Sequence, residues 1–173
     1  MSGRSFWEYA VLMAVLVLLQ VLLLDNLGLG LYIVPQVYIL LIAMLPSRTP
    51  PAATMLWALL LGVVMDMLSG TAGLNVIALV CTSFCRKWIM NATLGVAAVR
   101  EGVIALPAKV GGSKVLRYLL LLTAVNFTVY FIFEALSFRF FYLTLIKIVL
   151  STAVSALLCY LCILLFWGRH NKK

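Results

Sequence analysis

Apolar residues run along this chain in long stretches separated by short polar turns, with no alternation of polar and apolar positions. A helix that crosses a membrane needs about 20 consecutive apolar residues, and tight hairpins allow shorter ones. This pattern predicts an all-α membrane protein with six transmembrane helices in one domain, 1–173. Their expected ranges are 6–24, 31–45, 52–68, 73–90, 118–136 and 141–167. The second range is short and is interrupted by Pro35 and Gln36.

The composition agrees with this reading. Hydrophobic residues make up 65% of the chain and charged residues only 10%, whereas soluble domains have about 45–50% apolar and about 25% charged residues. The 173 residues leave no room for a separate soluble domain beside six helices. The cysteines form two pairs at helical spacing, Cys81/Cys85 and Cys159/Cys162, with no histidine nearby. We expect them to pack between helices, and we predict no metal, cofactor or disulfide framework.

Basic residues predict the orientation of the helices. With a cytoplasmic N-terminus, the even-numbered loops and the C-terminus are cytoplasmic too, and these segments hold 11 of the 13 Lys and Arg. They are Arg4, Arg48, Arg86, Lys87, Arg100, Lys109, Lys114, Arg117, Arg169, Lys172 and Lys173. Because Lys and Arg in short loops remain inside, both termini should be cytoplasmic. The net charge of +8 is scattered beside helix ends, which favours contact with lipid headgroups over nucleic acid binding.

The longest stretch outside the predicted helices is 91–117. Its middle mixes Ala, Val and Leu with Arg100, Glu101, Pro107 and Lys109. We interpret it as a partly helical segment on the cytoplasmic face of the membrane, followed by a hinge at Gly111 and Gly112. It is either a connector resting on lipid or a surface for a partner.

The most informative stretch runs from Gly62 to Asn75 and places a carboxylate among small residues inside an apolar sequence. A charge in hydrocarbon costs about 2.5 to 3.5 kcal/mol on insertion scales, so Asp66 needs a structural or functional reason. The four-residue spacing of Gly62, Asp66 and Gly70 places them on one helical face. Such a face permits close approach of another helix. The candidate residues for helix packing or partner contact are Gly62, Asp66, Ser69, Gly70, Gly73 and Asn75.

Three roles are open for Asp66. It can order the turn through the backbone N–H groups of Ser69 to Thr71, hold a helix of a neighbouring protein, or bind a ligand. Catalysis by proton transfer would require a partner from another helix, because no second carboxylate, His or Lys lies nearby in sequence. The chain also lacks nucleotide-binding, hydrolase and metalloprotease motifs. We therefore expect it not to be an enzyme.

The last two predicted helices each carry a polar face. Positions at helical spacing are Thr123, Asn126, Tyr130 and Glu134 in one, and Lys147, Ser151, Ser155 and Cys159 in the other. An antiparallel hairpin would bring Glu134 and Lys147 together, with Arg139 as a competing partner for the carboxylate. We predict an intramembrane pair of Glu134 and Lys147, because pairing makes both charges tolerable. The pair serves either helix packing or a path for a substrate or ion.

These features together resemble a known family. Six helices in about 170 residues, and the pattern Gly62-x-x-x-Asp66-x-x-Ser69-Gly70-x-x-Gly73-Leu74-Asn75, are similar to the bacterial rod shape-determining protein MreD. Asp25 and the Pro35-Gln36 pair also fit this layout. Members of the family often have His where this chain has Asn75.

The resemblance implies a non-enzymatic scaffold of the cell-elongation machinery in the bacterial cytoplasmic membrane, which maintains cell shape. Its expected partners are the single-span protein MreC, and, directly or through the complex, the glycosyltransferase RodA, a penicillin-binding transpeptidase and the actin-like MreB. The membrane core of the family is also similar to the vitamin-binding subunits of energy-coupling-factor transporters. A small-ligand-binding subunit of a transporter is therefore the alternative, with Asp66, Asn75, Glu134 and Lys147 lining an outward pocket. Similar architecture does not by itself transfer function.

Overall fold

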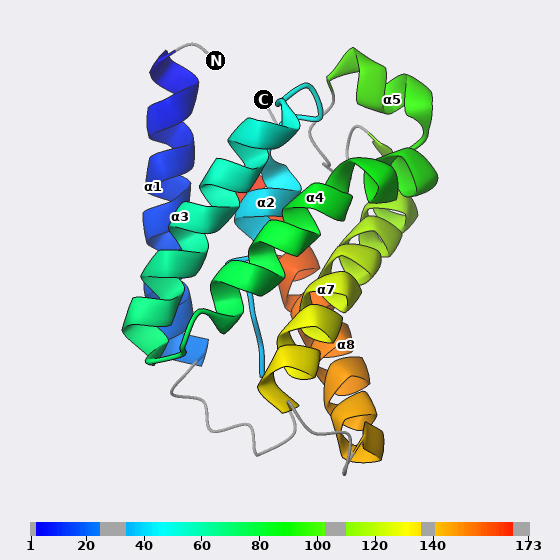
Figure 1. Cartoon of the computed structure of the whole chain (residues 1–173). Coiled ribbons are helices and arrows are strands. Elements are labelled where there is room, and N and C mark those ends of the chain that lie inside the picture. The colour runs from blue at the N-terminus through cyan, green and yellow to red at the C-terminus, as the bar shows by residue number, and fades with distance from the viewer. Residues whose placement is uncertain (1–2, 25–33, 103–109, 136–140, 168–173) are drawn as a thin grey trace.

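Helices are the only regular elements in the residues that the structure describes (Figure 1). The structure is a computed structural model that describes residues 3–24, 34–102, 110–135 and 141–167. The long helices are α1 (Gly3–Leu19), α3 (Pro51–Ser69), α4 (Leu74–Leu94), α7 (Gly112–Ala135) and α8 (Phe141–Trp167). The short elements are the π-helical turn η1 (Gln20–Leu24), α2 (Leu40–Met44) and α5 (Val96–Glu101).

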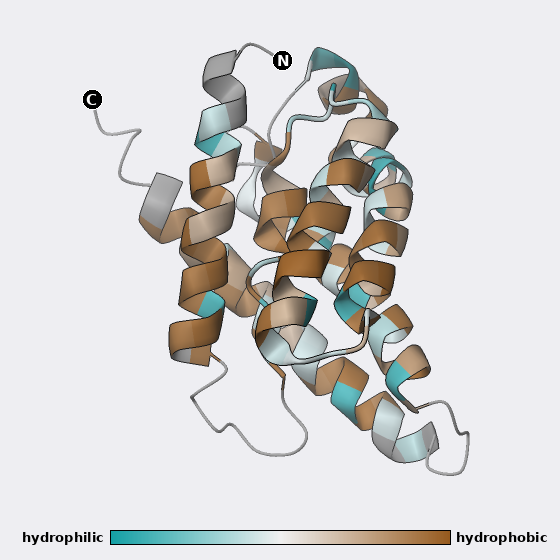
Figure 2. Ribbon diagram, turned by 60° about the vertical axis from the view of Figure 1, so that its left-hand side comes forward, coloured by the Kyte–Doolittle hydropathy of each residue, from teal (hydrophilic) through white to brown (hydrophobic). Residues whose placement is uncertain are grey.

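Three helices in the described residues are long and apolar enough to cross a membrane: α3, α7 and the Thr144–Leu165 part of α8. A shorter apolar helix covers Trp7–Leu22. Apolar residues continue along most of the length of these helices, whereas hydrophilic residues gather around α5 (Figure 2). The chain is thus an all-helical protein of membrane character, as its composition predicts.

The long helices form an antiparallel series in which α3 packs on α4, α4 on α7 and α7 on α8 (Figure 1). Predicted ranges 52–68, 73–90 and 141–167 correspond to α3, α4 and α8, and range 6–24 corresponds to α1 with η1. In α3, Pro51 occupies the start of the helix, where its missing N–H costs nothing. Long runs of Leu, Val and Ala then extend each helix.

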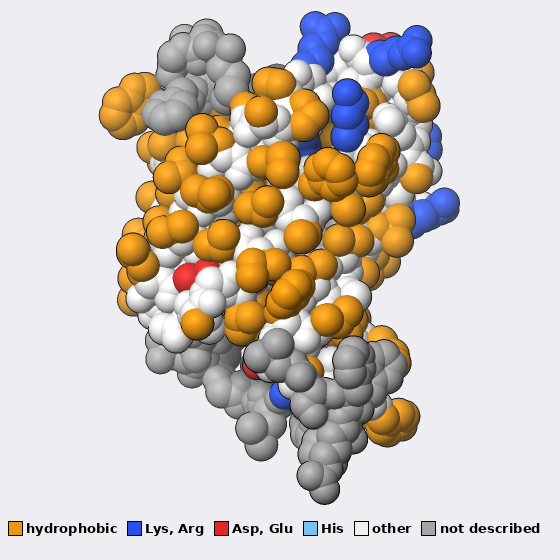
Figure 3. Space-filling model, viewed as in Figure 1, with side chains coloured by type: hydrophobic (Ala, Val, Ile, Leu, Met, Phe, Trp, Pro, Cys, Tyr) orange, Lys and Arg blue, Asp and Glu red, His pale blue; other side chains and the backbone are white. Residues whose placement is uncertain are grey.

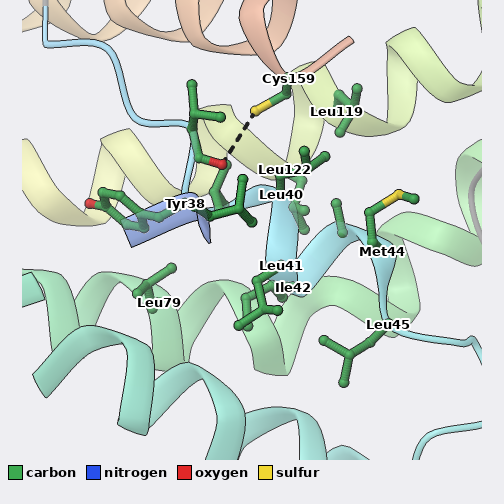
Figure 4. Packing of buried hydrophobic residues seen from close by; sticks show 14 of the residues in the cluster. Tyr38, Leu40, Leu41, Ile42, Met44, Leu45, Leu79, Leu119, Leu122 and Cys159 are labelled. Carbon is green, nitrogen blue, oxygen red and sulfur yellow. Dashed lines mark hydrogen bonds between the residues drawn. The ribbon is translucent and has the colours of Figure 1, made fainter. Parts of the chain in front are cut away.

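The centre of the molecule is α2 together with the residues just before it. Every side chain from Val37 to Leu45 is at most 2% exposed, and α7, α8 and α4 contribute Leu119, Leu122, Cys159 and Leu79 around them (Figure 4). A segment so short can be buried on all sides only because the longer helices surround it.

The helix predicted over 31–45, with an interruption at Pro35 and Gln36, is much shorter than expected in the described part of that range. Val34 to Val37 has no helical structure, a turn follows, and only Leu40–Met44 is α-helical. Pro35 has no backbone N–H and disfavours helix at the preceding residue. Buried side chains of other helices supply the missing hydrogen bonds, as described below. We call the stretch from Val34 to Leu45 the broken crossing.

The predicted segment 91–117 is partly helical, as expected, but its ends belong to the neighbouring helices. Helix α4 continues to Leu94, and α7 begins at Gly112 rather than near residue 118. Gly95, with φ of 92°, separates α4 from α5. The short helix is attached to the loop before α3, since Ser47 Oγ donates to the carbonyl of Val99 at 2.8 Å. Residues 103–109, in the middle of the predicted segment 91–117, lie outside the described residues.

Candidate functional site

The turn between α3 and α4 depends on two glycines. Gly70 ends α3 in the left-handed conformation, with φ of 67°, and its N–H donates to the carbonyl of Asp66. The N–H of Thr71 donates to the same carbonyl at 3.1 Å. Gly73, with φ of 84°, precedes the first residue of α4. Glycine adopts these angles without the steric cost that a side chain would add.

The carboxylate of Asp66 closes this turn. Its Oδ1 accepts hydrogen bonds from the Thr71 hydroxyl at 2.5 Å, from the Asn75 backbone N–H at 3.0 Å and from Asn75 Nδ2 at 2.9 Å. Its Oδ2 accepts from the backbone N–H of Val76 at 3.0 Å. These backbone groups belong to the first turn of α4, where N–H groups are unpaired and negative charge is favourable. Asp66 therefore caps the helix that follows its own.

This finding refines the predicted role of Asp66. An ordering role was among the expected ones, but the N–H groups that its carboxylate accepts belong to Asn75 and Val76 rather than to Ser69 to Thr71. Asn75 then extends the cluster, because its Oδ1 accepts a hydrogen bond from the hydroxyl of Tyr38 at 2.6 Å. The Asp66 cluster, defined as Asp66, Thr71, Asn75 and Tyr38, thus joins the turn to the broken crossing.

Gly62 lies where the backbone of α4 comes close to α3. A Cβ placed on it would lie 2.6 Å from Cα and 2.9 Å from the backbone nitrogen of Val76. Because those atoms are backbone, a larger residue would push the two helices apart. Gly62 therefore serves packing within the chain. Of the other predicted residues, Ser69 and Gly70 are exposed, and Asp66 and Asn75 are buried.

A second polar cluster surrounds the broken crossing and supplies its hydrogen bonds. Gln20 Nε2 donates to the carbonyl of Pro35 at 2.7 Å, and Gln20 Oε1 accepts from the N–H of Val37 at 2.9 Å. In α8, Ser151 Oγ accepts from the N–H of Val34 at 3.1 Å, and Ser155 Oγ accepts from the N–H of Gln36 at 2.9 Å. Buried backbone groups in an apolar protein require such partners.

The side chain of Gln36 completes this cluster. Its Oε1 accepts from Asn126 Nδ2 at 2.7 Å, and Thr82 Oγ1 lies 3.3 Å from Asn126 Oδ1. The Cys159 thiol points at the same backbone, with Sγ 3.9 Å from the carbonyl oxygens of Gln36 and Val37 (Figure 4). The polar face predicted on 141–167 therefore binds the chain's own backbone. Sequence reasoning missed Gln20, whose only signal was an amide near the end of an apolar stretch.

The predicted pair of Glu134 and Lys147 is not an ion pair within the part of the chain that the structure describes. Glu134 is exposed in the last turn of α7, whereas Lys147 Nζ lies 6.0 Å from the centre of the Phe131 ring. A cation over an aromatic face is attracted by the ring's quadrupole. Lys147 therefore contacts the Phe131 ring instead of the predicted carboxylate. Arg139, the competing partner, lies outside the described residues.

Arg86 is a charged residue that the sequence pattern misplaced. We counted it among the cations at the cytoplasmic surface, near the end of predicted range 73–90, but it is buried inside the molecule and only 3% exposed. Its Nη2 donates to the carbonyl of Leu45, at the end of the broken crossing. The Tyr118 hydroxyl contacts the same guanidinium and donates to the carbonyl of Ala43 at 3.4 Å. Arg86 therefore holds the last residues of the broken crossing against α4.

The chemistry that these residues can perform is limited by their bonding. The acceptors of Asp66 and the amides of Gln20, Gln36 and Asn75 are engaged by groups of the same chain. All four cysteines are free thiols. Within the described ranges, no group of three or more His, Cys, Asp or Glu is placed to hold a metal ion. Comparisons with protein-family models, curated proteins and solved structures gave no match for this chain.

Proposed function

We propose that this protein is a non-enzymatic scaffold of the bacterial cytoplasmic membrane, similar to MreD, that helps to position the enzymes of peptidoglycan synthesis during cell elongation. In this proposal the chain crosses the membrane six times, with both termini in the cytoplasm. The three long apolar helices and the shorter one at Trp7–Leu22 support a multi-pass protein. The broken crossing, packed between them, is the proposed second pass.

The observation that carries this proposal is the bonding of Asp66. A carboxylate that binds a substrate or a proton needs an accessible lone pair, whereas four hydrogen bonds from the same chain hold this one. Asp66 is also only 9% exposed. The motif thus orders the turn between two helices, which supports a structural role for this carboxylate.

The proposed partner is a single-span MreC-like protein, on the strength of the resemblance in the Gly62–Asn75 stretch. RodA, a penicillin-binding transpeptidase and MreB would be reached directly or through that complex. The surface offered to a partner helix in lipid is apolar. On α3, for example, Leu56 is 60% and Met67 is 79% exposed. In lipid, association depends on packing between such surfaces.

The direct test is co-purification from bacterial membranes. The tagged chain would be co-expressed with an MreC-like protein from a rod-shaped bacterium, and in parallel with an unrelated single-span protein of equal length. We expect the MreC-like protein to be retained in about stoichiometric amount through detergent washes and the unrelated protein to be lost. Equal recovery of both, or of neither, would contradict the scaffold proposal.

The transport alternative predicts that the same purified chain retains a small ligand instead of the MreC-like protein. It requires Asp66 and Asn75 to contact a small ligand, although in the structure they bond to each other. Mass spectrometry of the purified chain would then detect a retained small molecule that is lost in the Asp66→Ala variant. That result, together with no retention of the MreC-like protein, would replace the scaffold by a ligand-binding subunit.

A further inference from the structure

A cleft lies at the start of α3, at the opposite end of that helix from the Asp66 cluster. It contains about 290 Å³ of space, part of it open to solvent, between the loop before α3 and one face of α4. Ser47 and Thr54 line one side, and Ser83, Arg86 and Lys87 line the other. Lys and Arg side chains gather on this end of the molecule (Figure 3).

Two buried donors in this cleft have no hydrogen-bond partner among the residues that the structure describes. They are the hydroxyl of Ser83 and Nε of Arg86, and each residue is only 3% exposed. Leaving a buried donor unpaired is costly, and more so for a charged group. Both residues line the same cleft, so one bound group would satisfy both.

The remaining polar groups of the cleft determine the charge of that ligand. Ser47 and Thr54 donate their hydroxyl protons to the carbonyls of Val99 and Pro51, so their oxygens remain only as acceptors. Arg86 and the exposed Lys87 supply positive charge, and the lining contains no Asp or Glu. The available donors therefore face the cleft with net positive charge, which selects an anion.

We propose that this cleft binds a phosphate group, with Ser83, Arg86 and Lys87 as its donors. Three donors from separate side chains suit the several oxygens of a tetrahedral oxyanion, and guanidinium geometry matches phosphate. Either an anionic lipid headgroup or a free phosphate presents this chemistry. The proposal goes beyond the scaffold function and does not depend on it.

The test uses the full chain and three variants in micelles of a maltoside detergent, which has no phosphate group. Inorganic phosphate would be titrated into these micelles while binding heat and the thermal unfolding midpoint are measured. In parallel, the midpoint would be compared before and after phosphatidylglycerol is added to the micelles. Ser83→Ala should raise the Kd for inorganic phosphate about tenfold, because a hydrogen bond to a charged ligand is lost. Lys87→Gln should weaken it as well, whereas Lys114→Gln, an exposed cation outside the cleft, should not.

A second matched variant separates binding from folding. Thr152 in α8 also has a buried hydroxyl without a partner in the described ranges, but it does not line this cleft. Without phosphate or anionic lipid, Ser83→Ala and Thr152→Val should both unfold like the wild type. A response to inorganic phosphate identifies a soluble phosphate ligand, and a response to phosphatidylglycerol alone identifies a headgroup. The proposal is overturned if neither anion stabilises the protein, or if Ser83→Ala responds as the wild type does.

Discussion

At the scale of single residues, Asp66 shows how a carboxylate is kept inside an apolar protein. Among the described residues it forms no ion pair, and its charge is stabilised by two backbone N–H groups, an amide and a hydroxyl. Hydrogen bonds of this kind lower the free energy of the charged form in the same way as an N-terminal cap.

The replacement Asp66→Asn should therefore destabilise the fold. One carboxylate oxygen becomes an NH₂ group that faces N–H donors, and the favourable charge at the start of α4 is lost. We expect the free energy of unfolding to fall by about 2 kcal/mol. It would be measured by titrating the detergent-solubilised protein with a denaturing detergent. Ser69→Ala, an exposed change in the last turn of α3, should stay within about 0.5 kcal/mol. Equal stability of the two variants would exclude the capping role.

At the scale of elements, the broken crossing is a piece of chain whose hydrogen bonds come from elsewhere. A helix satisfies its own backbone, and for that reason helices can cross a membrane alone. Between Val34 and Val37 this function passes to side chains of Gln20, Ser151 and Ser155. Non-helical backbone is tolerated at such depth only where protein surrounds it, and Gln36 is only 3% exposed.

Two neighbouring hydroxyls of α8 test this dependence. Ser155→Ala removes the acceptor of the Gln36 N–H and leaves that group unpaired, so we expect a loss of about 2 kcal/mol. Thr152→Val removes a hydroxyl that has no partner and should leave stability unchanged or raise it slightly. Both would be followed by denaturing-detergent titration. If the two variants lost the same stability, the serine would not support the broken crossing.

At the scale of the whole molecule, the orientation of the helices across the membrane is a prediction from the distribution of Lys and Arg. With both termini in the cytoplasm, the α3–α4 turn faces outward and the start of α7 faces inward. The antiparallel series of α3, α4 and α7 places these two points at opposite ends of the bundle (Figure 1).

Thiol labelling in intact cells tests that orientation. Ser69→Cys and Ser113→Cys each add one thiol at an exposed position, in chains whose native cysteines are unchanged. A membrane-impermeant reagent should label Ser69→Cys in intact cells but Ser113→Cys only after the membrane is opened. The wild-type chain gives the background from its own thiols. Labelling in the reverse order would place the termini outside.

The sequence was informative where a helix forms its own backbone hydrogen bonds, and uninformative where groups far apart in the chain bond to each other. Long apolar runs predicted α3, α4 and α8 closely, and the Gly62 and Asp66 pattern marked the correct turn. Two partners of the broken crossing, Ser151 and Ser155, lie more than 110 residues away in α8, so no local pattern reveals them. Arg86, near the end of the predicted range 73–90, was counted as a topology signal because a buried cation that binds a backbone carbonyl looks the same in sequence as a cation at the membrane surface.

The hydrogen bonds between the broken crossing and α8 also determine when, during synthesis, this part of the chain can finish folding. A ribosome completes Val34–Leu45 long before it reaches Ser151 and Ser155, which accept the N–H groups of Val34 and Gln36. Until then, this segment must wait near the translocation machinery or at the membrane surface with part of its backbone unpaired. The broken crossing is therefore synthesised early, but its hydrogen bonds to α8 can form only after the final helix has been made.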